Sequence, residues 1–91
     1  MYKNKRGTSN RTCLCGSWKN HWLNFSGKEW PSTCSVYGCQ NKPTLGGHIY
    51  NTDSKNEYIV PLCDTCNHRE DEFSLKVDRK VSANVSKTRG K

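Results

Sequence analysis

The stretch "CSVYGCQNKPTLGGHIYNTDSKNEYIVPLCDTC", residues 34–66, holds two close pairs of cysteines. Four residues separate Cys34 from Cys39, two separate Cys63 from Cys66, and twenty-three lie between the pairs. Each close pair can bind one side of a tetrahedral zinc ion, for which thiolate is a preferred ligand. The spacing therefore predicts a four-cysteine zinc site, and a pair of disulfides is the alternative.

The residues between and after the cysteine pairs predict the elements around this site. "HIY" and "EYIVPL" are β-prone, and "NTDSKN" between them has turn chemistry, so we predict a β-hairpin. The segment "DTCNHREDEFSLK" after Cys63 has good helix formers with acids in its first turns, which predicts a helix. Two ligands then come from a turn and two from a helix start. The expected fold class is α+β, a small zinc-stabilised treble clef of knuckle, hairpin and helix.

A tryptophan-rich segment, "TCLCGSWKNHWLNFSGKEWPST", precedes the first cysteine pair. Its Trp18, Trp22 and Phe25 are spaced as one face of a short helix over residues 17–25. We expect this face to supply core, and to pack the segment against the hairpin that contains Ile49, Ile59 and Leu62, because the chain has few other large apolar residues. Base stacking is the alternative use of these rings.

Composition sets the class of protein. The chain has 91 residues, 32% hydrophobic residues and a mean hydropathy of −0.97, so it forms one domain with a thin core that needs a metal or disulfides. The opening "MYKNKRGTSNRT" lacks the apolar run of a secretory signal, and no stretch approaches the length of a membrane span. We therefore expect a cytoplasmic monomer whose six cysteines stay reduced and favour metal.

The net charge of +7 is concentrated at the two ends of the chain. Residues 1–11 predict a disordered basic arm, residues 12–78 the zinc-binding domain, and residues 79–91 a basic tail. Such arms attract phosphates, which makes DNA or RNA the expected partner. Solubility of a small domain, or binding to a protein, are the alternatives. The candidate nucleic-acid-binding residues are Lys3, Lys5, Arg6, Arg11, Arg79, Lys80, Lys87 and Arg89.

The motifs "CSVYGC", "GGHI" and "YIVPLCDTCNH" together resemble the zinc-stabilised branch of the HNH endonuclease family, over residues 34 to about 70. The resemblance implies a treble clef in which His48 is the general base, while Asn67 or His68 helps hold magnesium or a similar cation. The chain departs from the family at Tyr58, where an asparagine is usual, and at Gly47, where an acid or histidine is usual. We therefore expect a non-catalytic binding module, with a metal-dependent nuclease as the alternative.

The sequence also suggests a second zinc site, in which His48 would be a metal ligand instead of a general base. Cys13, Cys15 and His21 are three zinc ligands within nine residues, and they lack a fourth. His48, beside flexible glycines, can complete two thiolates and two imidazoles as a closed structural site. Asn67 or His68 are alternative fourth ligands. The other interpretation is that both cysteines are plain thiols and that His21 packs against tryptophan.

Overall fold

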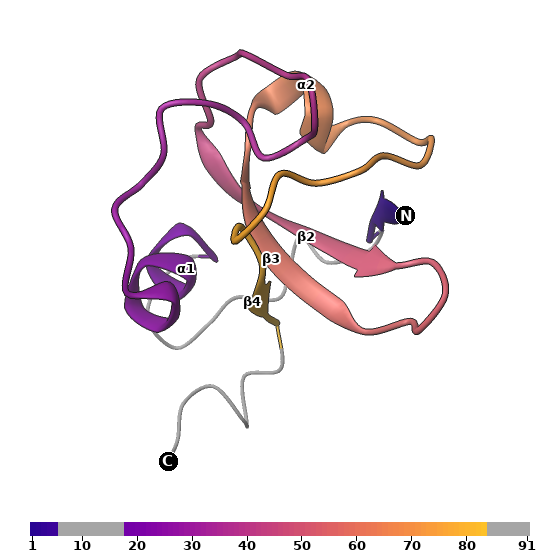
Figure 1. The fold of residues 1–91 in the computed structure, drawn as a ribbon, viewed down its shortest axis with the longest axis horizontal. Coiled ribbons are helices and arrows are strands. Elements are labelled where there is room, and N and C mark those ends of the chain that lie inside the picture. Colours follow the sequence, from indigo (N-terminus) through magenta and orange to yellow (C-terminus); the bar gives the residue numbers. More distant parts are fainter. Residues whose placement is uncertain (6–17, 84–91) are drawn as a thin grey trace.

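The computed structural model describes residues 1–5 and 18–83 of the chain. At its centre lies a four-stranded antiparallel sheet in the order β1-β2-β3-β4 (Figure 1). The strands are β1 (Tyr2–Asn4), β2 (Leu45–Asn51), β3 (Glu57–Leu62) and β4 (Val81–Ser82). Helix α1 spans Trp18–Ser26 and the short helix α2 spans Asp64–Asn67. The predicted α+β class is confirmed.

The predicted hairpin is strands β2 and β3, with His48 paired to Ile59. Its turn is stabilised by Asn51, whose side-chain oxygen accepts hydrogen bonds from the backbone N–H groups of Asp53 (2.8 Å) and Ser54 (3.0 Å). Asparagine favours such turns because its short side chain can replace a backbone acceptor. The turn chemistry visible in the sequence thus fixes the register of the two strands.

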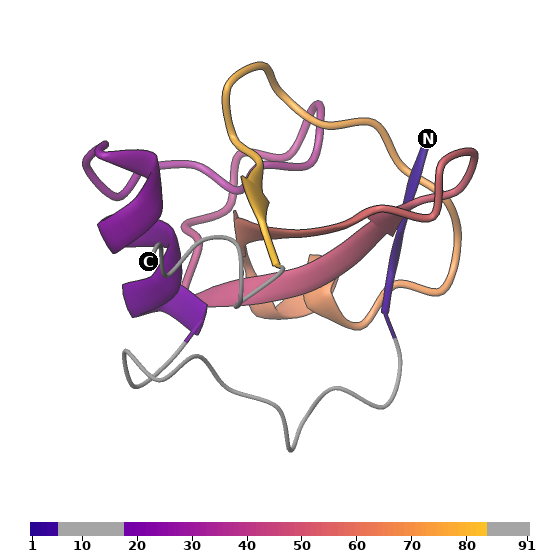
Figure 2. The same ribbon diagram turned by 90° about the horizontal axis from the view of Figure 1, so that it is seen from below.

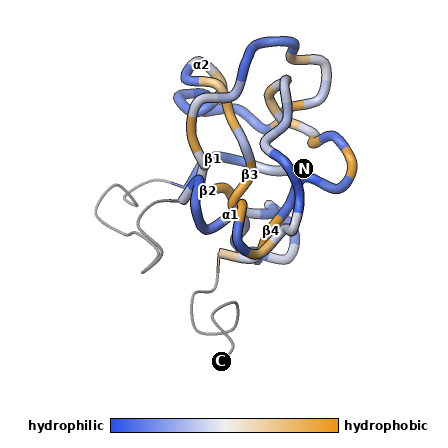
Figure 3. Tube along the Cα trace, turned by 90° about the vertical axis from the view of Figure 1, so that its left-hand side faces the viewer, coloured by the Kyte–Doolittle hydropathy of each residue, from blue (hydrophilic) through white to orange (hydrophobic). Residues whose placement is uncertain are grey.

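The sheet buries apolar side chains on both faces, because successive residues of a strand point in opposite directions. On one face Ile49, Val60 and Leu62 pack against the four cysteines. On the other face Ile59 packs with Trp22 of α1. Figure 3 shows hydrophobic colour along β3 in the middle of the fold. The face with the cysteines is called the cysteine face below, and the other the α1 face.

Helix α1 confirms the helix predicted over residues 17–25, and it covers the α1 face of the sheet (Figure 2). Trp22 is only 1% exposed, Trp18 is half-buried and Phe25 is 39% exposed, so the expected tryptophan core is present without Phe25. Of the three hairpin residues expected beneath this helix, Ile59 is there. Ile49 and Leu62 instead belong to the cluster on the cysteine face, which corrects that part of the expectation.

The N-terminal residues differ from the disordered arm that the sequence predicts over residues 1–11. Strand β1 pairs with β2, and Tyr2 also exchanges two backbone hydrogen bonds of 2.9 Å with Phe73. These two-sided contacts hold the first residues in the fold because a strand edge needs partners for its N–H and C=O groups. Residues 6–11 lie outside the described part of the chain.

The helix predicted over residues 64–76 ends at Asn67. Beyond it the chain runs back along the domain, and Leu75 forms an isolated bridge with Val36. Phe73, 3% exposed, is buried in the cluster on the cysteine face, and continued helix would not place it there. Tertiary packing therefore overrides local helix propensity. The predicted basic tail, residues 79–91, also differs, since Val81–Ser82 form β4; residues 84–91 lie outside the described residues.

Gly46 lets α1 approach β2 closely. A Cβ atom at this position would lie 2.6 Å from the carbonyl carbon of Trp18 and 2.7 Å from the backbone nitrogen of Lys19. Because the clash is with helix backbone, Gly46→Ala should shift α1 and lower the free energy of unfolding by about 1–3 kcal/mol, measured by urea denaturation. Gly27→Asn is the control, since Gly27 has φ +70 with no atom within 4 Å and asparagine tolerates that region. Equal stabilities of the two variants would contradict this reading.

Candidate metal centre

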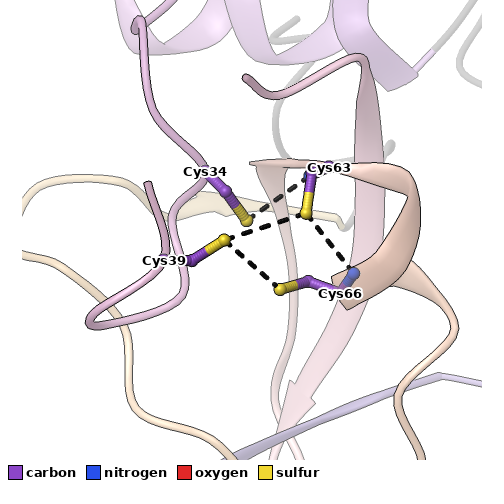
Figure 4. A group of neighbouring side chains, drawn as sticks. All are labelled: Cys34, Cys39, Cys63 and Cys66. Carbon is purple, nitrogen blue, oxygen red and sulfur yellow. Dashed lines mark hydrogen bonds between the residues drawn. The ribbon is translucent and has the colours of Figure 1, made fainter. Parts of the chain in front are cut away.

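The four predicted cysteine ligands lie together at one place in the structure (Figure 4). Their sulfur atoms are all within 4.8 Å of one another. Cys34 and Cys39 come from the loop before β2, and Cys63 and Cys66 from the start of α2. Within residues 1–5 and 18–83, this is the one group of three or more Cys, His, Asp or Glu side chains arranged to hold a metal ion.

The spacing of the sulfurs fits a tetrahedral zinc ion. The Sγ of Cys39 lies 3.9 Å from that of Cys63 and 3.8 Å from that of Cys66. Four sulfurs at about 2.3 Å from a central zinc are about 3.8 Å apart, whereas sulfurs in a disulfide are about 2.05 Å apart. All four cysteines are free thiols. The geometry therefore favours a metal over the two disulfides left open by the sequence.

Backbone N–H groups at the start of α2 donate hydrogen bonds to the ligand sulfurs. Cys63 is the N-cap of α2, and its sulfur accepts a hydrogen bond from the N–H of Cys66 (3.4 Å) and another from the amide of Asn41 (3.7 Å). The N–H of Cys63 in turn donates to the sulfur of Cys34 (3.4 Å). Donors at a helix start stabilise negative charge on sulfur. The local fold thus supplies hydrogen bonds to two of the four ligands.

These contacts separate the pKa values of the buried thiols. Burial alone would raise the pKa of Cys63, but the hydrogen bonds from Cys66 and Asn41 lower it to about 7. Burial raises the pKa of Cys34 and of Cys66 above the ordinary value for a thiol. Cys63 is therefore the most easily ionised of these three ligands, and zinc must displace protons from the others.

Two cations lie beside the four-cysteine cluster, which would carry a net charge of about −2 with zinc bound. The ammonium of Lys76 donates to the carbonyl oxygen of Cys39 (2.7 Å) and to the hydroxyl of Thr33 (3.0 Å). Arg69 interacts electrostatically with Cys66, and also binds Asp71 through two hydrogen bonds of 3.0 and 2.6 Å. Both cations reduce the cost of concentrating negative charge at a half-buried site.

The catalytic set implied by the HNH resemblance is not brought together. The ring of His48 lies on the α1 face, 5.2 Å from that of Trp18 between centroids. Asn67 lies on the cysteine face, where its Oδ1 would be 3.2 Å from a Cβ atom at Gly47. His68 is exposed, with its Nδ1 2.8 Å from the carbonyl oxygen of Asp64. Because adjacent residues of β2 point to opposite faces, the sheet separates His48 from α2.

The histidines of the predicted second zinc site share the α1 face. His21 is completely buried, and its Nε2 is 2.8 Å from the carbonyl oxygen of Ser82. Its ring, like that of His48, makes an edge contact with Trp18 at 5.2 Å between centroids. Cys13 and Cys15 lie outside the described residues. The structure thus places the two histidines of this set against the same tryptophan ring, and Asn67 on the other face of the sheet.

Glu57 is a site residue that the sequence reasoning missed. Its carboxylate oxygen lies 2.7 Å from Nε2 of His48. The hairpin register puts Glu57 two residues before Ile59, the partner of His48, and therefore diagonally across on the same face. Once the hairpin is predicted with its register, this diagonal pair is the signal by which Glu57 could have been found.

The four candidate nucleic-acid-binding residues that the structure describes separate into three groups. Arg79 donates to the carbonyl oxygen of Thr33 (2.9 Å) and to the hydroxyl of Ser35 (3.3 Å), which makes it part of the internal scaffold. Lys80 donates to the phenol oxygen of Tyr2 (2.9 Å) and lies over the rings of Tyr2 and Tyr58. Lys3 and Lys5 flank a pocket beside β1. Outside the described residues are Arg6, Arg11, Lys87 and Arg89.

Comparisons of the chain with protein-family models, with curated proteins and with solved structures found no match. Neither described helix has the length and apolar character needed to cross a membrane. Function is therefore inferred from the residues and geometry of the site itself. It belongs to a small α+β domain with a four-stranded antiparallel sheet and a four-cysteine cluster whose geometry fits zinc.

Proposed function

We propose that this protein is a zinc-binding module with an HNH-like treble-clef frame, which binds nucleic acid and does not cleave it. The order of elements supports the frame, because a loop with two cysteines leads to a hairpin and then to a short helix with the other two. In a treble clef this order places two ligands on a turn and two on the first turn of a helix, as the cluster here has them.

The separation of His48 from α2 supports a non-catalytic role. A general base needs a position from which it can reach a water on the metal, in the same pocket as the cation ligands. His48 and Asn67 are on opposite faces of the sheet, and His48 is 6% exposed. This arrangement leaves the HNH-like frame without a shared active site for the residues that the family resemblance implies.

The main support for nucleic-acid binding is a pocket of about 340 Å³ beside β1. Three of its six lining residues are basic. Two ammonium groups lie near the ring of Tyr50, those of Lys5 at 5.9 Å and Lys55 at 5.8 Å from the ring centroid. Lysines attract phosphate and a tyrosine ring offers a surface on which a base can stack. The residues that line the pocket are Lys3, Asn4, Lys5, Tyr50, Arg69 and Glu70.

Nearby acids limit how much positive charge this pocket presents. The guanidinium of Arg69 is bound by Asp71, and the ammonium of Lys5 lies 3.5 Å from Glu57. Arg6 directly follows Lys5 in the sequence and adds to the basic residues at this end of the chain. Lys3 in β1 and Lys5 just after it, with the basic residues that follow, are therefore the groups proposed to contact phosphate.

Salt dependence tests this proposal. With about four phosphate contacts, the affinity for labelled DNA or RNA should fall roughly 100-fold between about 50 and 200 mM salt. The double variant Lys3→Ala/Lys5→Ala should bind more weakly and reduce the slope of log affinity against log salt by about 2. Fluorescence anisotropy with single-stranded DNA, duplex DNA and RNA measures both quantities.

Lys28→Ala is the matched control, because Lys28 follows α1 and its ammonium donates to the carbonyl oxygen of Asp78 (2.8 Å). Its salt dependence should equal that of the parent protein. Absence of binding to all three nucleic acids at low salt would overturn the proposal and favour a protein partner. Plasmid cleavage in magnesium that disappears in His48→Ala would contradict the non-catalytic part and favour a nuclease.

A further inference from the structure

Cys39 differs from the other three cysteines of the metal cluster in its exposure to solvent. The other three are between 0% and 5% exposed, whereas Cys39 is half-buried. It follows a surface turn that is closed by a hydrogen bond from its own N–H to the carbonyl oxygen of Val36 (3.0 Å). In that turn Tyr37 is 74% exposed. Cys39 is therefore the ligand of the cluster that a small solute reaches most easily.

The sulfur of Cys39 also lies close to two partners for a disulfide. It is 3.8 Å from the sulfur of Cys66 and 3.9 Å from that of Cys63, and Figure 4 shows it turned toward both across the cluster. Because a disulfide has an S–S distance of about 2.05 Å, closing one requires a movement of about 2 Å. The turn before Cys39 has room for this movement, since no atom lies within 4 Å of a Cβ placed at Gly38.

We propose that Cys39 is an oxidation site through which hydroperoxides release zinc from the four-cysteine cluster. In the first step the sulfur of Cys39 attacks the peroxide, so that an S–O bond forms and the O–O bond breaks. The second step is attack by the sulfur of Cys66 or Cys63 on the sulfenic acid of Cys39. It forms the S–S bond and breaks the S–O bond.

Electrons and protons balance over the two steps. Two thiolates together give up two electrons, which the peroxide accepts. Its far oxygen leaves as an alcoholate, or as hydroxide when the oxidant is hydrogen peroxide, and takes one proton from solvent. The oxygen held by the sulfenic acid leaves as hydroxide and takes a second proton. The products are one disulfide, one alcohol and one water, or two waters with hydrogen peroxide.

The disulfide removes two of the four ligands at once, and structural zinc sites need all four. Cys39 lies in the loop before β2, and its partners lie at the start of α2. The new bond therefore joins the same two segments of the chain that the ion would join. Oxidised protein thus loses the metal but keeps one link at this place, from which a reductant and added zinc can restore the original site.

Peroxide treatment of the zinc-loaded, full-length protein tests this inference. A chromogenic chelator should report zinc release well above its rate without peroxide, and tandem mass spectrometry should show Cys39 linked to Cys63 or Cys66. Dithiothreitol with added zinc should restore the metal content. In Cys39→His an imidazole replaces the thiolate as a zinc ligand and cannot form the disulfide, so peroxide-dependent release should be at least about tenfold slower.

Cys13→Ser/Cys15→Ser is the matched control for the two cysteines that lie outside the described residues. This double variant should release zinc from the four-cysteine cluster at the parent rate, because Cys39 is unchanged. A second measurement needs only the parent protein, and so holds even if a variant fails to fold. Trapping of sulfenic acid with dimedone early in the reaction should label Cys39 before the three buried ligands.

The inference rests on the zinc site of the proposed function and not on nucleic-acid binding, and the experiment separates the two failures. A parent protein that carries no zinc before oxidation would contradict the zinc site itself. Zinc-loaded parent protein that keeps its metal in peroxide would overturn the oxidation site alone. So would a disulfide within the cluster that omits Cys39, or equal release rates in the parent protein and Cys39→His.

Discussion

Removal of zinc from the reduced protein with a chelator is expected to unfold it. The ion would join the loop that holds Cys34 and Cys39 to the start of α2, and three of these sulfurs are buried within the cluster on the cysteine face. Structural zinc sites contribute about 10–16 kcal/mol of apparent binding free energy, comparable to or larger than the roughly 5–15 kcal/mol that stabilises a typical domain. Loss of amide dispersion in the ¹H–¹⁵N spectrum measures the transition.

Two controls separate zinc from disulfides. A reductant alone should leave the spectrum dispersed, because the described cysteines are free thiols. Cys66→Ala should behave as the chelated protein does even with zinc added, since it removes a buried ligand. A reduced, metal-free protein that keeps its dispersed spectrum would show that the four sulfurs do not hold the fold through an ion.

Trp22→Ala is expected to cost about 3–5 kcal/mol of unfolding free energy. Trp22 is the largest buried side chain on the α1 face, where it packs with Ile59 and makes an edge contact of 5.5 Å with Trp30. Its indole N–H also donates to the carbonyl oxygen of Arg79 (2.8 Å), which would lose that partner. A domain of this size should show a melting temperature at least about 12 °C lower by thermal denaturation.

Phe25→Ala is the comparison within the same helix. Phe25 is partly exposed and makes a tilted ring contact with His21 at 4.9 Å between centroids. Truncation there should cost well under the Trp22 value, because a half-exposed ring loses less buried area. If both variants melted within a few degrees of the parent protein, α1 would not be an integral part of the core.

Local patterns were sufficient for several parts of the structure. β-prone segments and turn chemistry predicted the β2–β3 hairpin, and the spacing of Trp18, Trp22 and Phe25 predicted α1. The two close cysteine pairs predicted a cluster that the structure shows, because each pair needs only a tight turn or one helical turn to converge. These features depend on residues near one another in the chain.

Other features depended on contacts between distant residues. Residues 2–4 became a strand because β2 and Phe73 offer backbone partners, and the helix after Cys63 stopped because Phe73 and Leu75 pack elsewhere. Gly47 faces Asn67, and because neighbouring residues of β2 point to opposite faces, His48 lies on the other face of the sheet. The partner Glu57 is likewise brought to His48 by strand pairing.

The sequence by itself determined which residues can form elements and which sulfurs can share an ion, because short-range sterics and ligand spacing act within a few residues. Only the tertiary structure decided on which face of the sheet each functional side chain lies. That choice follows from strand pairing and from burying Trp22 and Phe73, whose packing free energy exceeds local preferences of a few tenths of a kcal/mol to about 1 kcal/mol per residue.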